Sequence, residues 1–249
     1  MRAVVPVSLL LLAGVVAAQD PYGDISDLKF ANPKDKEDAP SVPPPPGAVV
    51  LFDGKGFDKW VHRDGKTEVK WKLVESLKAM QVTRSTDIIT REKFAGPFKL
   101  HVEFRVPYEP KNKGQGRGNS GVYVQGRWEV QVLDSYGIAK PEMGDCGAIY
   151  GIAVPKVNAC KAPTVWQTYD IEFTPPECKD DKKVKNGRMT VYHNGIKIHD
   201  NQEITKDVTT SGIPPAKPGD VCKPGPILLQ DHGNPVQYRN VWLLKGEEK

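Results

Sequence analysis

Apolar residues recur at every second position in several short segments of this chain, and this alternation constrains the fold more than any other feature. Phe98–Val106, Arg127–Asp134 and Tyr169–Thr174 each alternate apolar with polar residues, and Asn194-Gly195 supplies a two-residue hairpin turn. A period of two places successive side chains on opposite faces of a β-strand. Because Gly- and Pro-rich connections separate the strands and no long helical period occurs, the sequence predicts an all-β, antiparallel jelly-roll sandwich.

The N-terminus carries the pattern of an export signal. Arg2 precedes an apolar stretch that ends in Val16-Ala17-Ala18, a small-residue cleavage site. We therefore expect a signal peptide at residues 1–18 and a mature chain that begins at Gln19 and is exported to a periplasm, a cell surface or the medium. The alternative is a membrane anchor, which needs about 20 apolar residues and a stop-transfer flank. No second apolar run of that length follows, so we expect no membrane span after cleavage.

Residues 19–46 are rich in proline and lack a periodic apolar pattern. They predict an extended linker, or a disordered N-terminus without a role of its own, before one domain at residues 47–245. The formal net charge is +4, with Lys and Arg interspersed among Asp and Glu. Without a basic stripe, nucleic acid is not an expected partner.

Four cysteines follow the predicted signal, and an even number in an exported chain indicates two disulfides. Their spacing favours Cys146–Cys160 and Cys178–Cys222, although three pairings are possible. A metal site is the alternative, and the absence of a CxxC motif weakens it.

Amide, carboxylate and aromatic groups gather in Gly118–Ser135 and in Gly225–Asn240. A sheet face that displays such groups suits a ligand made of hydroxyls and ring faces, because amides form directional hydrogen bonds to hydroxyls. The alternative is an ordinary solvated sheet face. The expected pocket has Glu129 and His232 as candidate catalytic residues, and its candidate substrate-binding residues are Arg105, Asn119, Ser120, Tyr123, Gln131, Gln230 and Asn234.

Glu129 is the first candidate for acid–base chemistry, because its neighbours Trp128 and Val130 are apolar and a desolvated carboxyl has a raised pKa. The alternative is a surface glutamate paired with an arginine. His232 is the second candidate, because imidazole titrates near neutral pH, and its alternative is a loop histidine bonded to backbone. Glu129 and Asp134 are not the carboxylate pair of a glycosidase, since they lie five residues apart and point to opposite faces of a strand. Asp170 or Glu172 could pair with Glu129 only if their strand faces the same groove.

The order of several motifs resembles the 3-keto-disaccharide hydrolase family, whose domains have a concanavalin A-like lectin/glucanase fold. The motifs that carry the resemblance are Leu51–Trp60, Lys99–Val106, Gly118–Ser135, Trp166–Phe173, Tyr192–Asn201 and Gly225–Leu243.

The resemblance implies cleavage of glucosides or disaccharides already oxidised to a ketone at C3. The ketone acidifies the C2 proton, so that one base can remove it, the enolate can expel the aglycone from C1, and water can add back. Glu129 or His232 would be the base, while Gln131, Gln230, Arg105 or a divalent metal ion would stabilise the enolate. No other cofactor is evident. The alternatives are a non-catalytic carbohydrate-binding module and, more remotely, a structural or adhesion domain.

Overall fold

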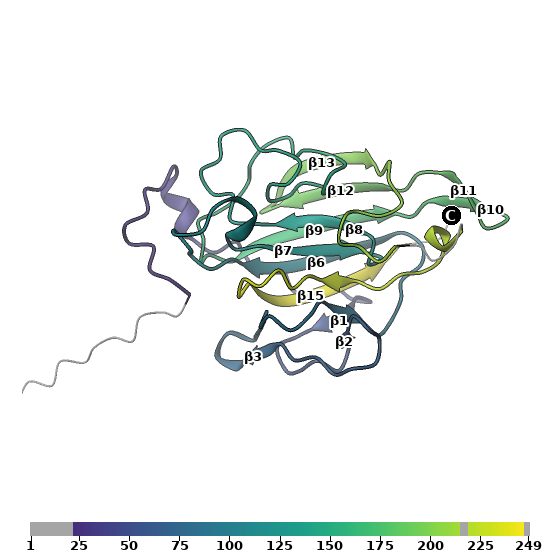
Figure 1. Ribbon diagram of the computed structural model, residues 1–249, viewed down its shortest axis with the longest axis horizontal. Coiled ribbons are helices and arrows are strands. Elements are labelled where there is room, and N and C mark those ends of the chain that lie inside the picture. Colours follow the sequence, from purple (N-terminus) through teal and green to yellow (C-terminus); the bar gives the residue numbers. More distant parts are fainter. Residues whose placement is uncertain (1–21, 215–218, 247–249) are drawn as a thin grey trace, which may run out of the picture.

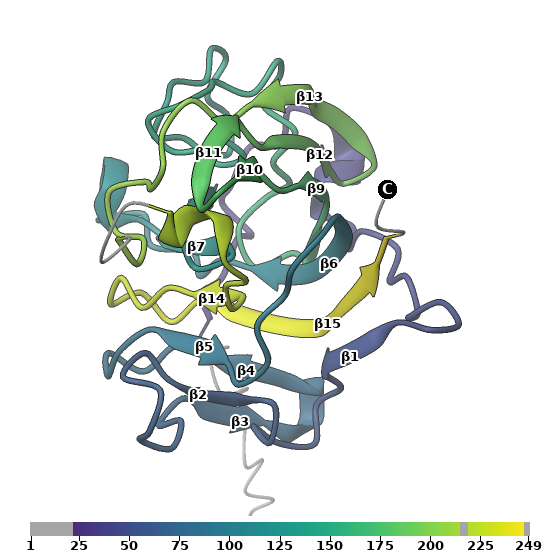
Figure 2. The ribbon, with the colours of Figure 1, turned by 90° about the vertical axis from the view of Figure 1, so that its right-hand side faces the viewer.

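The alternating segments of the sequence form the strands of two antiparallel sheets that pack face to face (Figures 1 and 2). The computed structural model describes residues 22–214 and 219–246, so the expected signal peptide at 1–18 lies outside the described residues. Sheet A has eight strands in the order β13-β12-β9-β6-β15-β4-β3, with β1 also paired to β15. Its strands are β1 (Val49–Phe52), β3 (Lys72–Val74), β4 (Ala79–Gln81), β6 (Phe98–Arg105), β9 (Gln167–Thr174), β12 (Arg188–His193), β13 (Ile196–Glu203) and β15 (Gln237–Lys245).

Sheet B has five strands in the order β2-β5-β14-β7-β8, and a separate two-stranded ribbon joins β10 to β11. The strands of sheet B are β2 (Trp60–His62), β5 (Ile88–Thr90), β7 (Ser120–Val124), β8 (Trp128–Val132) and β14 (Leu228–Leu229). The ribbon consists of β10 (Glu177–Lys179) and β11 (Lys182–Lys185), and the four 3-10 turns are η1 (Pro33–Lys36), η2 (Glu75–Leu77), η3 (Gly114–Gly116) and η4 (Asp220–Cys222). No helix within 22–214 and 219–246 has the length and apolar character needed to cross a membrane.

The core lies between the two sheets and is filled by the apolar members of the alternating segments. Leu100 and Phe104 of β6 and Trp128 and Val130 of β8 are buried in one hydrophobic cluster. Burial of each such side chain stabilises the fold by about 1.5–3 kcal/mol. The predicted all-β sandwich is therefore confirmed, and the polar members of the same strands face outward on either side of it.

Residues near both ends of the segment 22–46 contact the outer face of sheet A. The Tyr22 hydroxyl donates to the backbone oxygen of Arg105 over 2.7 Å, and Tyr22 is only 4% exposed. Farther along, Trp242 of β15 donates from its indole nitrogen to the Val42 oxygen over 3.1 Å. This segment therefore covers polar side chains that would otherwise meet solvent.

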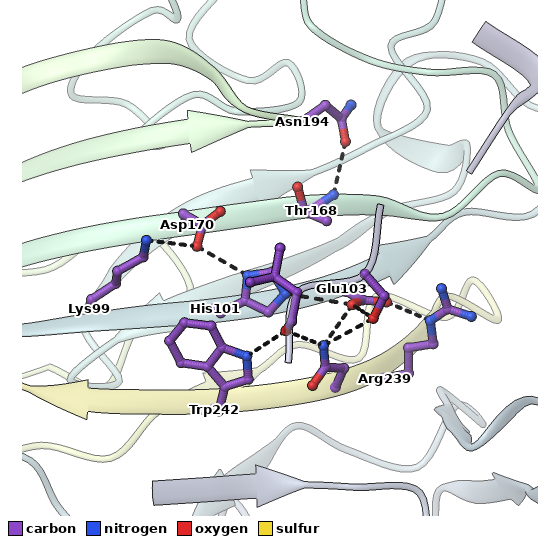
Figure 3. Close-up of polar contacts among 11 residues, drawn as sticks. Lys99, His101, Glu103, Thr168, Asp170, Asn194, Arg239 and Trp242 are labelled. Atoms are coloured by element: carbon purple, nitrogen blue, oxygen red, sulfur yellow. Dashed lines mark hydrogen bonds and ion pairs between the residues drawn. The ribbon is translucent and has the colours of Figure 1, made fainter. Parts of the chain in front are cut away.

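A charged network on β6, β9 and β15 lies beneath this segment (Figure 3). The Glu103 carboxylate accepts hydrogen bonds from Ser41, Asn240 and Arg239. Burial acts to raise the pKa of Glu103, but hydrogen bonds from His101 and these partners outweigh it and lower the pKa to about 2. His101 also bonds Asp170, and although burial acts against its charged form, the two carboxyl groups raise the pKa of His101 above its usual value.

One of the two predicted disulfides is present. Cys178 and Cys222 are bonded, with their Cα atoms 6.0 Å apart, and the bond ties β10 to η4. The predicted Cys146–Cys160 disulfide is wrong for this structure, in which both cysteines are free. The Cys146 sulfur lies 3.1 Å from the Tyr169 hydroxyl and within 4.8 Å of the Cys160 sulfur.

Candidate active site

Three neighbouring strands of sheet B place their outward side chains in two rows. Tyr123 of β7 is in register with Glu129 of β8 on one side and with Leu228 of β14 on the other. In the next row, Gly121 of β7 is in register with Gln131 of β8, and the Gln230 backbone nitrogen donates to the Gly121 oxygen over 3.0 Å. The strand period of two thus brings Tyr123, Glu129, Gln131 and Gln230 onto one face.

Loops cover this face and leave a small pocket above it. The segment from Gly147 to Tyr150 pairs with the free edge of β8, since the Gln131 backbone nitrogen donates to the Ala148 backbone oxygen and the Tyr150 backbone nitrogen donates to the Glu129 backbone oxygen. Residues 206–213 cross the β7–β8 turn, where the Thr209 and Ile213 backbone nitrogens donate to the Arg127 and Gly126 backbone oxygens. The pocket has a volume of about 50 Å³ and is lined by Gln115, Asn119, Glu129, Gln131, Tyr150, Thr210, Ser211, Gln230 and His232.

Gly121 creates the space in which the Glu129 carboxyl group lies. A Cβ atom at this position would come within 2.5 Å of the Glu129 Oε1 atom and within 2.8 Å of the Tyr123 Cε2 atom. Any side chain would therefore displace the carboxyl group from the floor of the pocket.

Glu129 is the sole carboxylate among the described residues that line the pocket, and it is only 3% exposed. Burial raises the pKa of Glu129 to about 7, the nearby negative charge of Asp87 acts in the same direction, and a hydrogen bond from Tyr123 partly opposes the rise. A carboxyl group with this pKa exchanges its proton near neutral pH, as a general base or acid must.

Tyr123 connects Glu129 to Gln230. The Gln230 amide nitrogen donates to the Tyr123 oxygen over 2.9 Å, which leaves the phenolic hydrogen for Glu129. Burial and the adjacent Glu129 charge raise the pKa of Tyr123, so the phenol stays protonated at neutral pH. Tyr123 therefore positions Glu129 through a hydrogen bond rather than acting as an acid itself.

Four amide side chains line the pocket, those of Gln115, Asn119, Gln131 and Gln230. Asn119 donates from its amide nitrogen to the Gln115 backbone oxygen over 2.7 Å, and Gln131 donates to the Gly144 oxygen over 3.2 Å. Backbone oxygens only accept, so these partners fix the orientation of both amides. The side-chain oxygens of Asn119, Gln131 and Gln230 are buried and have no hydrogen-bond partner among the described residues.

Unpartnered buried acceptors indicate a ligand that brings hydrogen donors or positive charge. Sugar hydroxyls supply hydrogen donors. A hard divalent cation also fits, since amide oxygens and a carboxylate are the ligands that Mg²⁺ and Ca²⁺ take. Both amide hydrogens of Gln131 are taken by Gln115 and by the Gly144 oxygen, so in this orientation Gln131 has no hydrogen left to donate to an enolate.

His232 lies at the mouth of the pocket. It follows β14 in the chain, lines the pocket and is exposed to solvent. Its ring is thus reachable by a group that leaves or enters the site, whereas Glu129 is enclosed.

Three of the expected binding residues do not reach the pocket. Arg105 lies on the outer face of sheet A, where it donates to Gln237 and where its guanidinium group lies 4.2 Å from the centre of the Tyr22 ring. Ser120 points into the core, because its position in β7 has the opposite parity to Gly121, and the Tyr238 hydroxyl donates to it. Asn234 donates to Glu109 and to the Gly116 oxygen, so it supports the loop before β7.

Four further residues of the pocket come from loops and were not expected from the sequence: Gln115, Tyr150, Thr210 and Ser211. They lie outside the alternating segments, so periodicity gives no signal for them. Gly121 is also absent from the expected set. The one available clue was its place between Asn119 and Tyr123 on the same strand face.

A larger groove of about 650 Å³ lies on the same face of sheet B and includes Val61 and Ile89. The arginine side chains in its wall are already engaged, since Arg63 pairs with Asp87 and Arg91 pairs with Glu68. Its lining has no unpartnered buried side-chain atom among the described residues. We therefore place the chemistry in the smaller pocket.

The comparisons with known proteins agree with the architecture. Residues 47–244 match the model of the 3-keto-alpha-glucoside-1,2-lyase-like domain. The chain belongs to this family. A search of curated protein sequences gave no match.

Solved structures support the same assignment. A proposed glycosyl hydrolase from Parabacteroides distasonis is 32% identical, with a TM-score of 0.72, and the match covers 88% of this chain and 99% of that one. Two further proposed glycosyl hydrolases from Parabacteroides distasonis share the fold at lower identity. One is 21% identical with a TM-score of 0.56 over 81% of this chain and 95% of that one, and the other is 23% identical with a TM-score of 0.53 over 80% and 99%.

Proposed function

We propose that this chain cleaves 3-keto-glucosides or 3-keto-disaccharides by removing the C2 proton, eliminating the aglycone and hydrating the product. The observation that carries the proposal is a pocket whose one carboxylate among the described residues is Glu129, with a pKa of about 7. A conventional glycosidase needs two carboxyl groups across the glycosidic bond. Elimination next to a ketone needs one base, because the ketone itself acidifies the proton.

Glu129, Tyr123 and three of the amides have distinct roles in this scheme. Glu129 removes the C2 proton, while the hydrogen bond from Tyr123 holds its carboxylate in place. The oxygens of Asn119, Gln131 and Gln230 accept hydrogen bonds from sugar hydroxyls. A pocket of about 50 Å³ is smaller than typical small-ligand sites, which have about 300–1,000 Å³. It receives the C2–C3 edge of the ring, and the aglycone oxygen lies outward near His232.

Stabilisation of the enolate is the remaining requirement. Among the pocket-lining residues, hydroxyl donors come from Tyr150, Thr210 and Ser211. In the alternative arrangement, the oxygens of Asn119, Gln131 and Gln230 together with the Glu129 carboxylate would hold a divalent cation in place of sugar hydroxyls, and the cation would supply a positive charge for the same purpose. His232 donates a proton to the leaving oxygen.

The proposal is tested with a 3-keto-glucoside, the parent glucoside and the C2-deuterated ketone. We expect turnover of the ketone alone, slower turnover after deuteration, and a loss of about 10²–10⁴ in rate for Glu129→Gln. Glu172→Gln, which changes an exposed glutamate on β9, is the matched control and should keep full activity.

Equal turnover of the parent glucoside would contradict the proposal, as would full activity of Glu129→Gln. Binding of the 3-keto-glucoside without turnover in the wild type would identify a carbohydrate-binding module instead. Export to a periplasm, a cell surface or the medium, which we also propose from the N-terminal pattern, is tested by mass spectrometry of the mature N-terminus in fractionated cells.

A further inference from the structure

Three potential metal ligands meet behind the pocket. One ligand atom from each of Cys146, Cys160 and His193 lies within 4.8 Å of the other two. Cys146 and His193 are buried, at 2% and 0% exposure, and both cysteines are free. His193 ends β12, while Cys146 and Cys160 belong to the long connection between β8 and β9. The cluster thus joins sheet A to the loop that borders the active site.

The hydrogen bonds of His193 leave one ring nitrogen without a hydrogen and without a partner among the described residues. Its Nε2 atom lies 3.0 Å from the Gln167 Oε1 atom. That oxygen also receives the Lys161 backbone N–H over 2.8 Å, which shows that it acts as an acceptor. Nε2 therefore carries the hydrogen, and Nδ1 has a free lone pair. Nδ1 is buried and has no partner among the described residues.

This arrangement is the one that metal-binding histidines adopt. Such a histidine donates one ring N–H to a protein oxygen, which fixes the ring and directs the other nitrogen to the metal. A disulfide between Cys146 and Cys160 would use the two sulfur atoms and leave Nδ1 unpaired. A metal ion would satisfy all three groups at once.

We propose that Cys146, Cys160 and His193 bind a thiophilic d¹⁰ cation, zinc(II) or copper(I). Thiolate and imidazole ligands suit both ions. Metal–sulfur bonds of about 2.3 Å and metal–nitrogen bonds of about 2.0 Å separate neighbouring ligands by roughly 3.5–4 Å, within the limit of 4.8 Å that the cluster meets. Binding displaces the two thiol protons, and a divalent ion with two thiolates is neutral, which favours zinc in a buried site.

The site would fix the border of the active pocket. Cys146 directly precedes the segment Gly147–Tyr150, which pairs with β8 and brings Tyr150 to the pocket. Tyr169, whose hydroxyl lies 3.1 Å from the Cys146 sulfur, donates to the Gln131 backbone oxygen over 2.6 Å. A metal ion at this position therefore stabilises the strand edge that carries Glu129 and Gln131.

The test measures metal content directly and does not depend on activity. The full chain is purified without chelator, and zinc and copper are measured by elemental mass spectrometry; the reduced apoprotein is then titrated without oxygen with zinc(II) or copper(I). We expect one equivalent of one of the two ions in the wild type, absorption from thiolate-to-cobalt charge transfer after cobalt(II) substitution, and a rise in the unfolding temperature on loading.

Variants identify the ligands. Cys160→Ser and His193→Gln should each lose the bound ion and the cobalt absorption. His199→Gln is the matched control, because His199 is a buried histidine on β13 that bonds the Gly147 oxygen and lies outside the cluster. If the unreduced protein contains a Cys146–Cys160 disulfide and no metal, or if the variants retain the ion, the proposal is overturned.

Discussion

Replacing Glu129 by Gln should make the protein more stable at alkaline pH, by an amount that follows from its pKa. Burial raises this pKa from 4.5 to about 7. Between these values the folded protein retains a proton that the unfolded chain has released, so the wild type loses stability as the pH rises through this window. At about 1.4 kcal/mol per pH unit, the full difference is roughly 3 kcal/mol above pH 7. Gln does not titrate and keeps an oxygen to accept the Tyr123 hydrogen bond.

The assay is urea unfolding of the wild type and Glu129→Gln at pH 4, 6 and 8, followed by tryptophan fluorescence. The two proteins should have equal free energies of unfolding near pH 4, and the variant should gain roughly 3 kcal/mol at pH 8. For a domain of this size the gain corresponds to a rise of about 6–12 °C in the unfolding midpoint.

Glu103→Gln is the control with the opposite sign. The pKa of Glu103 is lowered to about 2, so its charge stabilises the fold above pH 4.5, and this stabilisation disappears as the pH falls toward 2. That variant should be less stable than the wild type at pH 7. If Glu129→Gln shows the same difference at pH 4 and pH 8, or no gain at pH 8, the carboxyl group is not held in the desolvated state described here.

Three further predictions concern the pocket and the disulfide. Gly121→Ala places a Cβ atom 2.5 Å from the Glu129 Oε1 atom, so we expect kcat/KM for a 3-keto-glucoside to fall about 10²-fold. An unchanged kcat/KM would show that the carboxyl group is not catalytic in this position. Tyr123→Phe removes a hydrogen bond that lowers the pKa of Glu129, so the acidic limb of the pH–rate profile should move to higher pH, and a limb that stays in place would exclude this role. Replacing both Cys178 and Cys222 by Ser opens a loop of 44 residues and should cost about 4 kcal/mol in urea unfolding, with activity retained; an unchanged free energy of unfolding would show that the bond does not constrain the unfolded chain.

The sequence predicted which side chains of β7 and β8 share a face, because the alternation of apolar and polar residues along a strand is a local property. Glu129, Gln131 and Tyr123 share a face as expected. The same rule should have excluded Ser120, which lies between Asn119 and Gly121 and must point the other way. Arg105 shows a different limit. Its outward position follows from alternation, but local sequence does not determine which sheet a strand joins, and β6 pairs with β15 and β9 in sheet A.

Groups brought together by loops could not be predicted from periodicity. Tyr150 reaches the pocket because its segment pairs with the edge of β8, a long-range contact without a local pattern. Cysteine spacing predicted the Cys178–Cys222 disulfide correctly, but it also predicted a Cys146–Cys160 disulfide that the structure does not contain. Spacing says nothing of the buried histidine beside that thiol, which arrives from a strand 47 residues later in the chain.

The position of residues 22–46 has a consequence for where this protein can be cut. The family match starts at residue 47, yet a fragment that begins there would lack Ser41 and Val42, the partners of Glu103 and Trp242. It would expose to water a carboxylate and an indole that the intact chain encloses. We therefore expect a fragment that begins at residue 47 to unfold at a lower urea concentration than the full chain, and we expect limited proteolysis of the native protein to find no cleavage at Ser41 or Val42.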